Sequence, residues 1–429
     1  MFMPFTNLGM IVVDEEHETS YRSSSSPRYD TVEVANFISD RTGATLLLSS
    51  ATPSVDTYLK ATTGVYKLLS LQNRVNNIPL PPVTITDMRM ELREGNRTPI
   101  SRILQEKISE NLLNGNQTLL FLNRRGYNTY VFCRNCGHIE MCPNCEVSLT
   151  SHISSSSLTC HYCGYKKALP RVCPECGSDK IKYMGSGTEK IERIVKQMFP
   201  DAVTLRLDSD TAAQKDMYEK ILGDFAAGRA DILIGTQMIV KGLDFDNVTL
   251  VGVLLADASL NFPDINASQR TFQLVSQAAG RAGRRGEKAM VVLQTYKPDN
   301  PTLIYCANHD YKGFFAYDID FRRKMDYPPF SELIGLFCAH EDENHAIADA
   351  QTLYERTDEL IKQKDYGNIK LYEVSAAFIQ KLKNKYIYHI IIRYEPESGF
   401  KRDLRENYDK IQKNIKSYVY AEINPITLL

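Results

Sequence analysis

Eight of the ten cysteines in this chain lie between residues 133 and 176, where they form four C-x-x-C pairs. Two C-x-x-C turns supply four thiolates, which is a complete tetrahedral ligand set for one structural zinc ion. Eight thiolates therefore predict two Zn²⁺ ions, both structural, because no coordination position is left for a substrate. The predicted ligand pairs are Cys133/Cys136, Cys142/Cys145, Cys160/Cys163 and Cys173/Cys176.

The spacing of the pairs favours a nested arrangement of the two zinc sites. Five residues separate Cys136 from Cys142, whereas fourteen separate Cys145 from Cys160, a suitable length for a zinc-ribbon loop. We therefore expect the two inner pairs to form one site and the two outer pairs the other. The alternative, redox-active C-x-x-C pairs, fits less well because four regular pairs make a closed framework. Three histidines lie among these cysteines and are predicted not to be ligands: His138, His152 and His161.

A second group of reactive side chains is Asp14-Glu15-Glu16-His17, which directly follows an apolar run at residues 9–13. Open α/β sheets bind ligands at the carboxyl ends of their parallel strands. At such a place Asp14 can hold Mg²⁺, usually through water, and Glu15 can orient and deprotonate an attacking water. Taken alone, two acids at the end of a strand are more often a solvated strand end.

Three further motifs follow in order along the chain. Ser50-Ala51-Thr52-Pro53-Ser54 comes after an apolar run at 45–48, and G-T-Q-M-I-V-K-G-L-D-F occupies 235–245. The stretch 273–286 contains Q-A-A-G-R-A-G-R and is expected to be a helix with Arg281 and Arg284 on one face. Arginine suits a phosphate site because its planar fork stays charged and grips two oxygens. Alone, this stretch is more often a solvated basic face.

The elements that position these residues predict an α/β fold. Up to about residue 300, short apolar runs alternate with amphipathic helical patterns, as in parallel sheets of βα units. Because the strands are apolar almost throughout, we expect both faces of each sheet to be covered. The expected strands are 9–13, 45–48, 118–122, 203–207, 231–234, 249–255 and 289–295, and the expected helices include 100–113, 189–199 and 218–225.

The pattern changes in two places. The cysteine-rich stretch 131–180 interrupts the βα units and is predicted to be an insertion. After residue 298 the expected order is strand 333–339, helix 346–362, strands 369–373 and 386–393, helix 403–417 and strand 419–422. That order predicts a small α+β domain of the split βαβ type.

Composition limits the classes of partner. The formal net charge is −1, so any contact with nucleic acid must come from local patches and not from bulk attraction. No apolar run approaches the ~18 residues needed to span a bilayer. The first residues do not read as a signal peptide. We therefore expect a cytoplasmic protein without a membrane partner.

The four motifs D-E-E-H, S-A-T-P-S, G-T-Q-M-I-V-K-G-L-D-F and Q-A-A-G-R-A-G-R resemble motifs II, III, V and VI of superfamily 2 helicases. N-R-R-G-Y at 123–127 and Y-P-P-F at 327–330 narrow the resemblance to the PriA family of replication-restart DNA helicases. The resemblance implies RecA-like lobes. Residues 1–70 would be an incomplete first lobe, 71–130 and 181–304 the second lobe, 131–180 the two-zinc insertion and 305–429 the C-terminal α+β domain.

This resemblance implies an ATP-dependent 3′→5′ DNA helicase that acts at stalled forks and in primosome assembly, with ATP and Mg²⁺ and the same nesting of zinc ligands. It implies DNA as a partner, branched or single-stranded, together with single-strand-binding protein and the machinery that loads the replicative helicase. The residues it assigns to nucleotide are Asp14, Glu15, His17, Asp244, Gln277, Arg281 and Arg284, and Lys241 would join Asp244 in linking nucleotide to DNA.

The loop at 17–29 resembles the family's aromatic-rich loop, which senses single-stranded DNA. Tyr21 and Tyr29 offer stacking faces, each stack being worth ~1–3 kcal/mol, and Arg22 and Arg28 offer positive charge. The alternative is a polar surface loop, which is the better interpretation of its serine run.

The chain departs from the family's pattern in two respects, the smaller being Asn424 before Pro425, where the family is expected to carry Asp. It contains no G-x-x-x-x-G-K-[ST] phosphate loop, since G-S-G-T at 185–188 has neither the spacing nor the lysine. We therefore expect negligible ATP hydrolysis by this chain alone. The alternative function is a non-catalytic, zinc-containing DNA-binding or primosome scaffold protein.

Overall fold

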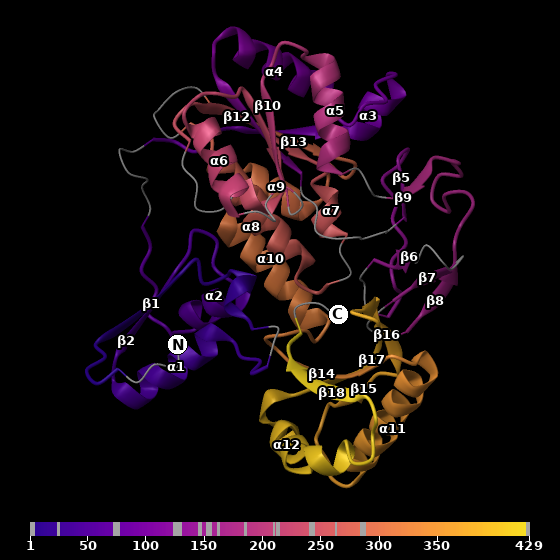
Figure 1. Cartoon of the computed structure of the whole chain (residues 1–429). Coiled ribbons are helices and arrows are strands. Elements are labelled where there is room, and N and C mark those ends of the chain that lie inside the picture. Colours follow the sequence, from indigo (N-terminus) through magenta and orange to yellow (C-terminus); the bar gives the residue numbers. More distant parts are fainter. Residues whose placement is uncertain are drawn as a thin grey trace. The chain divides into compact units, whose positions relative to one another are not determined.

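The computed structural model forms two compact units, Leu71–Tyr317, here called the central unit, and Met1–Ser70 with Asp318–Leu429, here called the terminal unit (Figure 1). The structure describes residues 5–23, 26–71, 78–122, 131–144, 148–151, 157–160, 164–183, 187–208, 211, 215–239, 245–261, 264–283 and 289–425.

The central unit is built on a sheet of six parallel strands in the order β10-β11-β4-β12-β13-β3. The register sets Leu120 opposite Ile234 on one side and Gly252 on the other. β4, β11 and β12 are buried along their whole length, as their apolar sequences predict. The strands are β3 (Val83–Asp87), β4 (Gln117–Leu122), β10 (Thr204–Leu207), β11 (Ile232–Gly235), β12 (Val248–Leu254) and β13 (Met290–Thr295).

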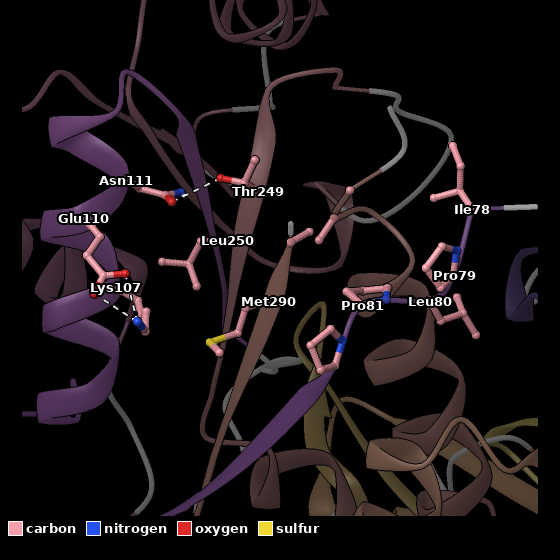
Figure 2. Close-up of a pocket in the computed structure, with 14 residues that line it drawn as sticks. Ile78, Pro79, Leu80, Pro81, Lys107, Glu110, Asn111, Thr249, Leu250 and Met290 are labelled. Carbon is pink, nitrogen blue, oxygen red and sulfur yellow. Dashed lines mark hydrogen bonds and ion pairs between the residues drawn. The ribbon is translucent and has the colours of Figure 1, made fainter. Parts of the chain in front are cut away.

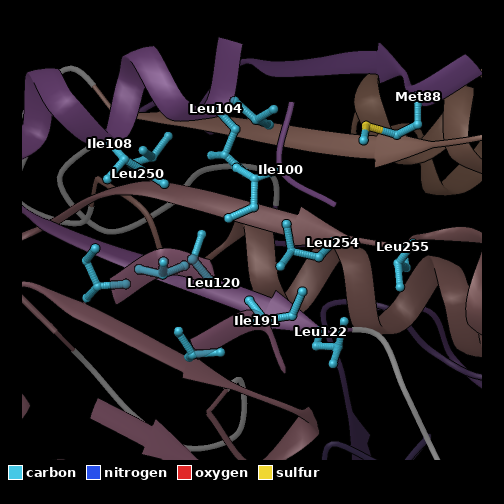
Figure 3. Close-up of a cluster of buried hydrophobic side chains, with 14 of the residues drawn as sticks. Met88, Ile100, Leu104, Ile108, Leu120, Leu122, Ile191, Leu250, Leu254 and Leu255 are labelled. Atoms are coloured by element: carbon cyan, nitrogen blue, oxygen red, sulfur yellow. The ribbon is translucent and has the colours of Figure 1, made fainter. Parts of the chain in front are cut away.

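Helices α4 (Arg102–Leu113) and α5 (Thr188–Met198) pack on the sheet and form the main core with it. Leu104 and Ile108 of α4 lie against Leu120 and Leu250 of the strands (Figure 3). Each such fully buried side chain contributes about 1.5–3 kcal/mol by leaving water. α4 begins after Ser101, whose hydroxyl accepts the Leu104 N–H at 3.3 Å.

The remaining helices of the central unit are α3 (Met88–Arg93), α6 (Lys215–Ala226), α7 (Asp257–Leu260), α8 (Ala267–Ala279), α9 (Pro301–Ala307) and α10 (Tyr311–Lys324), the last of which continues into the terminal unit. α8 contacts β12, α7 and α9. It ends at Ala279, and Gly283 follows with φ +68°. The expectation that Arg281 lies on a helix face is therefore wrong, because Gly280, a poor helix former, is already the C-cap residue.

The cysteine-rich stretch lies outside the six-stranded sheet and forms two small antiparallel sheets of its own. β5 pairs with β9 where the insertion leaves and rejoins the central unit, and the other three strands form the second sheet. The strands are β5 (Val131–Cys133), β6 (Thr150–Ser151), β7 (Ser157–Thr159), β8 (Lys166–Ala168) and β9 (Ile181–Tyr183).

The terminal unit begins with β1 (Met10–Asp14), α1 (Thr31–Thr42), β2 (Thr45–Ser49) and α2 (Val55–Thr62), in that order. β1 and β2 pair in parallel. α1 contacts both strands. Met10 and Val12 are each 56% exposed, so the expectation that both faces of this sheet are covered is wrong. A two-stranded sheet packed on α1 leaves its other face to solvent.

The C-terminal part of the terminal unit is an antiparallel sheet in the order β15-β17-β14-β18, with β16 also paired to β17. This order is that of the predicted split βαβ domain. Leu336, Leu353, Ile390 and Phe400 form its core with the helices. The elements are β14 (Glu332–His340), α11 (Glu343–Lys362), β15 (Lys370–Leu371), β16 (Ser375–Leu382), β17 (Lys385–Tyr394), α12 (Phe400–Ile411) and β18 (Tyr418–Ile423).

Within the described part of the chain, every helix is too short or too polar to cross a bilayer.

Candidate functional site

The first predicted acid, Asp14, ends β1 directly opposite Ser49 at the end of β2. Its Oδ1 accepts hydrogen bonds from the Ser49 hydroxyl at 2.6 Å and from the Glu15 N–H at 3.0 Å. Glu15 has φ +49°, in the left-handed region, where a residue with a side chain is strained by about 1–3 kcal/mol. The chain therefore turns sharply at the residue that is predicted to orient water.

The second turn is joined to the first through His17. Its Nδ1 lies 2.7 Å from the Ser50 hydroxyl and 3.5 Å from Oε2 of Glu15. The side chain of His17 is 3% exposed, whereas that of Glu15 is 45% exposed. The structure thus brings together Asp14, Glu15 and His17 with the turn after β2, and it leaves the Glu15 side chain half-exposed with its Oε2 buried.

Glu16 holds the same two turns together, and sequence reasoning gave it no role. Its buried carboxylate accepts the Ser54 N–H at 2.6 Å, the Ser54 hydroxyl at 3.1 Å and the Thr57 hydroxyl at 3.0 Å. Ser54 in turn caps α2 by accepting the Thr57 N–H at 3.2 Å. Burial raises the pKa of Glu16 above its usual value, although these hydrogen bonds act in the opposite direction. A third acid beside a hydroxyl-rich turn was the available signal.

The predicted DNA-sensing loop contacts the first acid and the C-terminal strand β18. The Tyr21 hydroxyl donates to the Asp14 carbonyl at 2.8 Å. Arg22 forms an ion pair with Asp30 at 2.7 Å and donates to the Asn424 carbonyl at 2.9 Å.

Arg28 of this loop is held twice by β18. Its Nε lies 3.0 Å from Oε1 of Glu422, and its guanidinium carbon lies 3.9 Å from the centre of the Tyr420 ring. A carboxylate and an aromatic face are the same kinds of partner that a phosphate and a base offer. The Tyr29 carbonyl closes the loop by accepting the Ser23 N–H at 2.9 Å. Both predicted DNA-contacting arginines are thus bound by protein groups.

Four of the predicted zinc ligands form one cluster. The sulfurs of Cys133, Cys136, Cys173 and Cys176 all lie within 4.8 Å of one another. Sγ of Cys133 is 3.7 Å from that of Cys176, and Sγ of Cys136 is 3.6 Å from that of Cys173. A tetrahedral site with Zn–S bonds of about 2.3 Å places its sulfurs about 3.8 Å apart. The donor set and its spacing therefore fit zinc, which these four thiolates would hold with no open position.

Each half of this cluster is a knuckle with the same turn. Gly137 N–H donates to the Cys133 carbonyl at 2.8 Å, and Gly177 N–H donates to the Cys173 carbonyl at 2.9 Å. Both glycines have positive φ, +79° and +68°. Hydrogen bonds from the Asn135 side chain and the Ser178 backbone lower the pKa of the Cys176 thiol to about 6. In the same cluster, burial raises the pKa of the Cys133 thiol and raises that of Cys136 to about 12.

The structure describes two of the four predicted ligands of the inner zinc site. Cys142 and Cys160 are buried, whereas Cys145 and Cys163 lie outside the described residues. The outer cluster has the membership that the nested arrangement predicts. The inner pairing stays a prediction.

The remaining predicted site residues belong to the central unit. Gln277 lies in α8 and Arg281 just beyond it, where Gly283 N–H donates to the Val248 carbonyl at the start of β12 at 3.1 Å. Lys241, Asp244 and Arg284 lie outside the described residues.

A cavity of about 580 Å³ opens at the amino ends of β3, β12 and β13 (Figure 2). Its walls are mainly apolar, and its polar groups are already bonded to one another. Lys107 pairs with Glu110 at 2.8 Å, and the Thr249 hydroxyl donates to Asn111 at 3.1 Å. Among the residues the structure describes, none of the predicted site residues lines this cavity.

Comparison with known proteins identifies two matching families within the central unit. Residues 142–167 match the PriA DNA helicase Cys-rich region, and residues 178–286 match the helicase conserved C-terminal domain. The chain is 41% identical over 432 residues to the replication restart protein PriA of Bacillus subtilis, covering 100% of this chain and 53% of that protein. It is 38% identical over 403 residues to the protein of that name from Synechocystis sp., covering 92% and 48%.

The chain is homologous to proteins named replication restart protein PriA. The resemblance predicted from the motifs is confirmed, as are the helicase-lobe fold class and a zinc-binding Cys-rich region as a PriA family feature. The chain spans about half the length of the curated PriA relatives it matches. Among solved structures, S. cerevisiae Dbp5 bound to RNA and ADP BeF3 aligns with 76% of this chain and 64% of that chain at 12% identity. Its TM-score of 0.37 is too low to bear on the fold.

Proposed function

We propose that this protein is an ATP-dependent 3′→5′ DNA helicase that acts in the restart of stalled replication forks and in primosome assembly. The observation that carries the proposal is the sequence identity to replication restart protein PriA along the whole chain. We place the protein in the cytoplasm, and its proposed partners are branched and single-stranded DNA, single-strand-binding protein and the machinery that loads the replicative helicase.

In this proposal the ends of β1 and β2 form one half of the nucleotide site. Asp14 would hold Mg²⁺ through water, and the half-exposed Glu15 side chain would orient the attacking water. The contact of Asp14 with Ser49 supports the first role, because it fixes this acid against the neighbouring strand. His17, which bonds to Ser50, lies 3.5 Å from the Glu15 carboxylate and supports the second. Gln277, Arg281 and Arg284 contact the phosphates from the second lobe, and Lys241 and Asp244 link nucleotide to DNA.

The zinc centres have a structural role in this proposal. The outer centre takes Cys133, Cys136, Cys173 and Cys176 as its ligands, and the inner centre takes the other four cysteines. The five-part division at residues 70, 130, 180 and 304 is proposed on the same basis.

The test is a strand-displacement assay with the protein purified from its native cells, at the length it has there. A partial duplex with a 3′ single-stranded tail should be unwound when ATP and Mg²⁺ are present, and the matched substrate with a 5′ tail should not. Glu15→Gln should lower the unwinding rate about 10²–10⁴-fold, the usual contribution of a general base, while DNA affinity stays unchanged.

An intact-mass measurement of the same sample completes the test. Tight DNA binding without ATP-driven displacement would replace the helicase by the second candidate, a non-catalytic zinc-containing scaffold. The scaffold function is the second candidate because these 429 residues contain no phosphate loop.

A further inference from the structure

Asp257 opens α7 and is 2% exposed, yet it belongs to none of the helicase motifs. Its Oδ1 accepts the Thr295 hydroxyl at 2.6 Å, and its Oδ2 accepts the Tyr296 N–H at 2.7 Å. Its own carbonyl accepts the side-chain amide of Asn261 at 2.6 Å. One buried carboxylate thus ties the turn after β12 to the end of β13. A buried polar group of this kind is costly unless it is hydrogen-bonded, as this one is at both oxygens.

The zinc-binding insertion contacts Tyr296 and Asn261, the residues that are hydrogen-bonded to Asp257. A Cβ placed on Gly137 would lie 2.3 Å from the Tyr296 carbonyl oxygen, so this knuckle touches the Tyr296 backbone directly. The Phe132 ring packs edge-on against the Tyr296 ring, with centroids 5.1 Å apart. At a second point the Ser148 hydroxyl donates to the Asn261 carbonyl. These two contacts of the insertion therefore end on residues bonded to Asp257, whereas Arg89 and Arg93 of α3 meet the knuckle at further points.

The other side of α7 faces α8. The Ser259 hydroxyl lies 2.6 Å from the Thr271 hydroxyl, and the two helices pack together. α8 carries Gln277 and leads into Arg281. A continuous set of contacts therefore runs from the zinc knuckle through Tyr296 and Asp257 to the helix that the proposed function assigns to nucleotide.

We propose that Asp257 is a positioning residue that transmits the metal state of the zinc knuckle to helix α8. The zinc ligands hold the knuckle in one shape, and the knuckle presses on the Tyr296 backbone whose N–H Asp257 binds. Loss of metal unfolds the knuckle and removes that support, so α7 loosens and α8 loses its partner Ser259. The role of α8 in nucleotide binding rests on the proposed helicase function, whereas the coupling between zinc and α8 does not depend on that function.

The experiment is hydrogen–deuterium exchange of the full chain with zinc bound and after removal of zinc by a chelator. Zinc removal should raise exchange in peptides of α8 by about 2- to 10-fold, the factor expected from losing one hydrogen bond between neutral groups. Peptides of α6, which packs on β10, should not change. Unchanged exchange in α8 of the wild-type chain would overturn the proposal.

Two variants distinguish transmission of the zinc state through Asp257 from a general loosening of α8. Asp257→Asn should exchange faster in α8 with zinc bound and respond no further to the chelator. The matched control is Asp264→Asn, another buried acid at the entry to α8, which pairs with Arg270 at 2.7 Å. It should keep the full zinc response.

If Asp257→Asn does not fold, Ser259→Ala removes the link between α7 and α8 without touching the buried carboxylate. α8 of this variant should then be insensitive to zinc. A wild-type zinc response in Asp257→Asn or Ser259→Ala refutes the transmission. Because unwinding is not measured, failure of the helicase proposal leaves this result interpretable.

Discussion

The two glycines that follow the outer cysteine pairs give a matched test of how the zinc knuckle is held. Gly137 and Gly177 occupy the same position in their turns, with φ of +79° and +68°. A Cβ on Gly137 would meet the Tyr296 carbonyl oxygen at 2.3 Å, whereas one on Gly177 would have nothing within 4 Å. Substitution by alanine therefore adds the same backbone strain to both turns and a collision to only one.

The structure sets the size of the difference. An alanine in the left-handed region costs about 1–2 kcal/mol, which is all that Gly177→Ala should cost. In Gly137→Ala the added methyl must move about 1 Å from the Tyr296 oxygen to reach ordinary contact distance. Overpacking of this kind costs about 1–3 kcal/mol more, because the Tyr296 backbone is held by Asp257.

Zinc affinity reports this difference, because metal binding and folding of the knuckle share one free energy. In competition with a chromophoric chelator, Gly137→Ala should bind zinc about 5- to 150-fold more weakly than Gly177→Ala, as 1–3 kcal/mol requires. Total zinc at saturation should be the same in both variants. Equal affinities would mean that the knuckle does not rest on Tyr296, and the reasoning would fail.

Three other predictions address separate parts of the chain. The raised pKa of Glu16 means that its contribution to stability is present below the unfolded-state pKa and lost as pH rises through the folded-state pKa. Urea unfolding across that window should therefore show a fall in stability that Glu16→Gln lacks, and parallel pH profiles would contradict this. Cys136→Ser should lower the bound zinc by one ion per chain in a metal analysis, whereas Cys338→Ser, at a buried position in β14, should leave it unchanged. Arg28→Met should weaken single-stranded DNA binding and reduce its salt slope by about one, while Glu422→Gln should strengthen binding without changing the slope. Fluorescence anisotropy at several salt concentrations measures both, and no change in either variant would remove Arg28 from the DNA site.

Much of the fold follows from local patterns in the sequence. Five of the six strands of the central sheet were predicted to within a few residues, because buried parallel strands are apolar on both faces. β3 was missed because prolines crowd its start and polar threonines alternate along it. The exposed face of β1 and β2 was not predicted, since coverage of a sheet depends on which segments reach it and not on its own sequence.

The candidate sites divide in the same way. The zinc ligands were recognisable because the ligand spacing is local, and the acids at the end of β1 because a strand end is a local feature. Glu16 and Asp257 were not singled out, since their roles depend on partners 38 residues or more away in sequence. The contact of Arg28 with Glu422 joins residues 394 positions apart, and local patterns carry no information on such pairs.

The contact between Gly137 and Tyr296 has a consequence for the order of synthesis. The four sulfurs of the outer cluster leave the ribosome with residue 176, whereas Tyr296 follows 120 residues later. At about 5–20 residues per second, the tetrathiolate exists for roughly 6–24 s without the strand end that later covers it. Metal supply during translation therefore decides whether that strand end meets a finished knuckle or four reduced thiols open to oxidation.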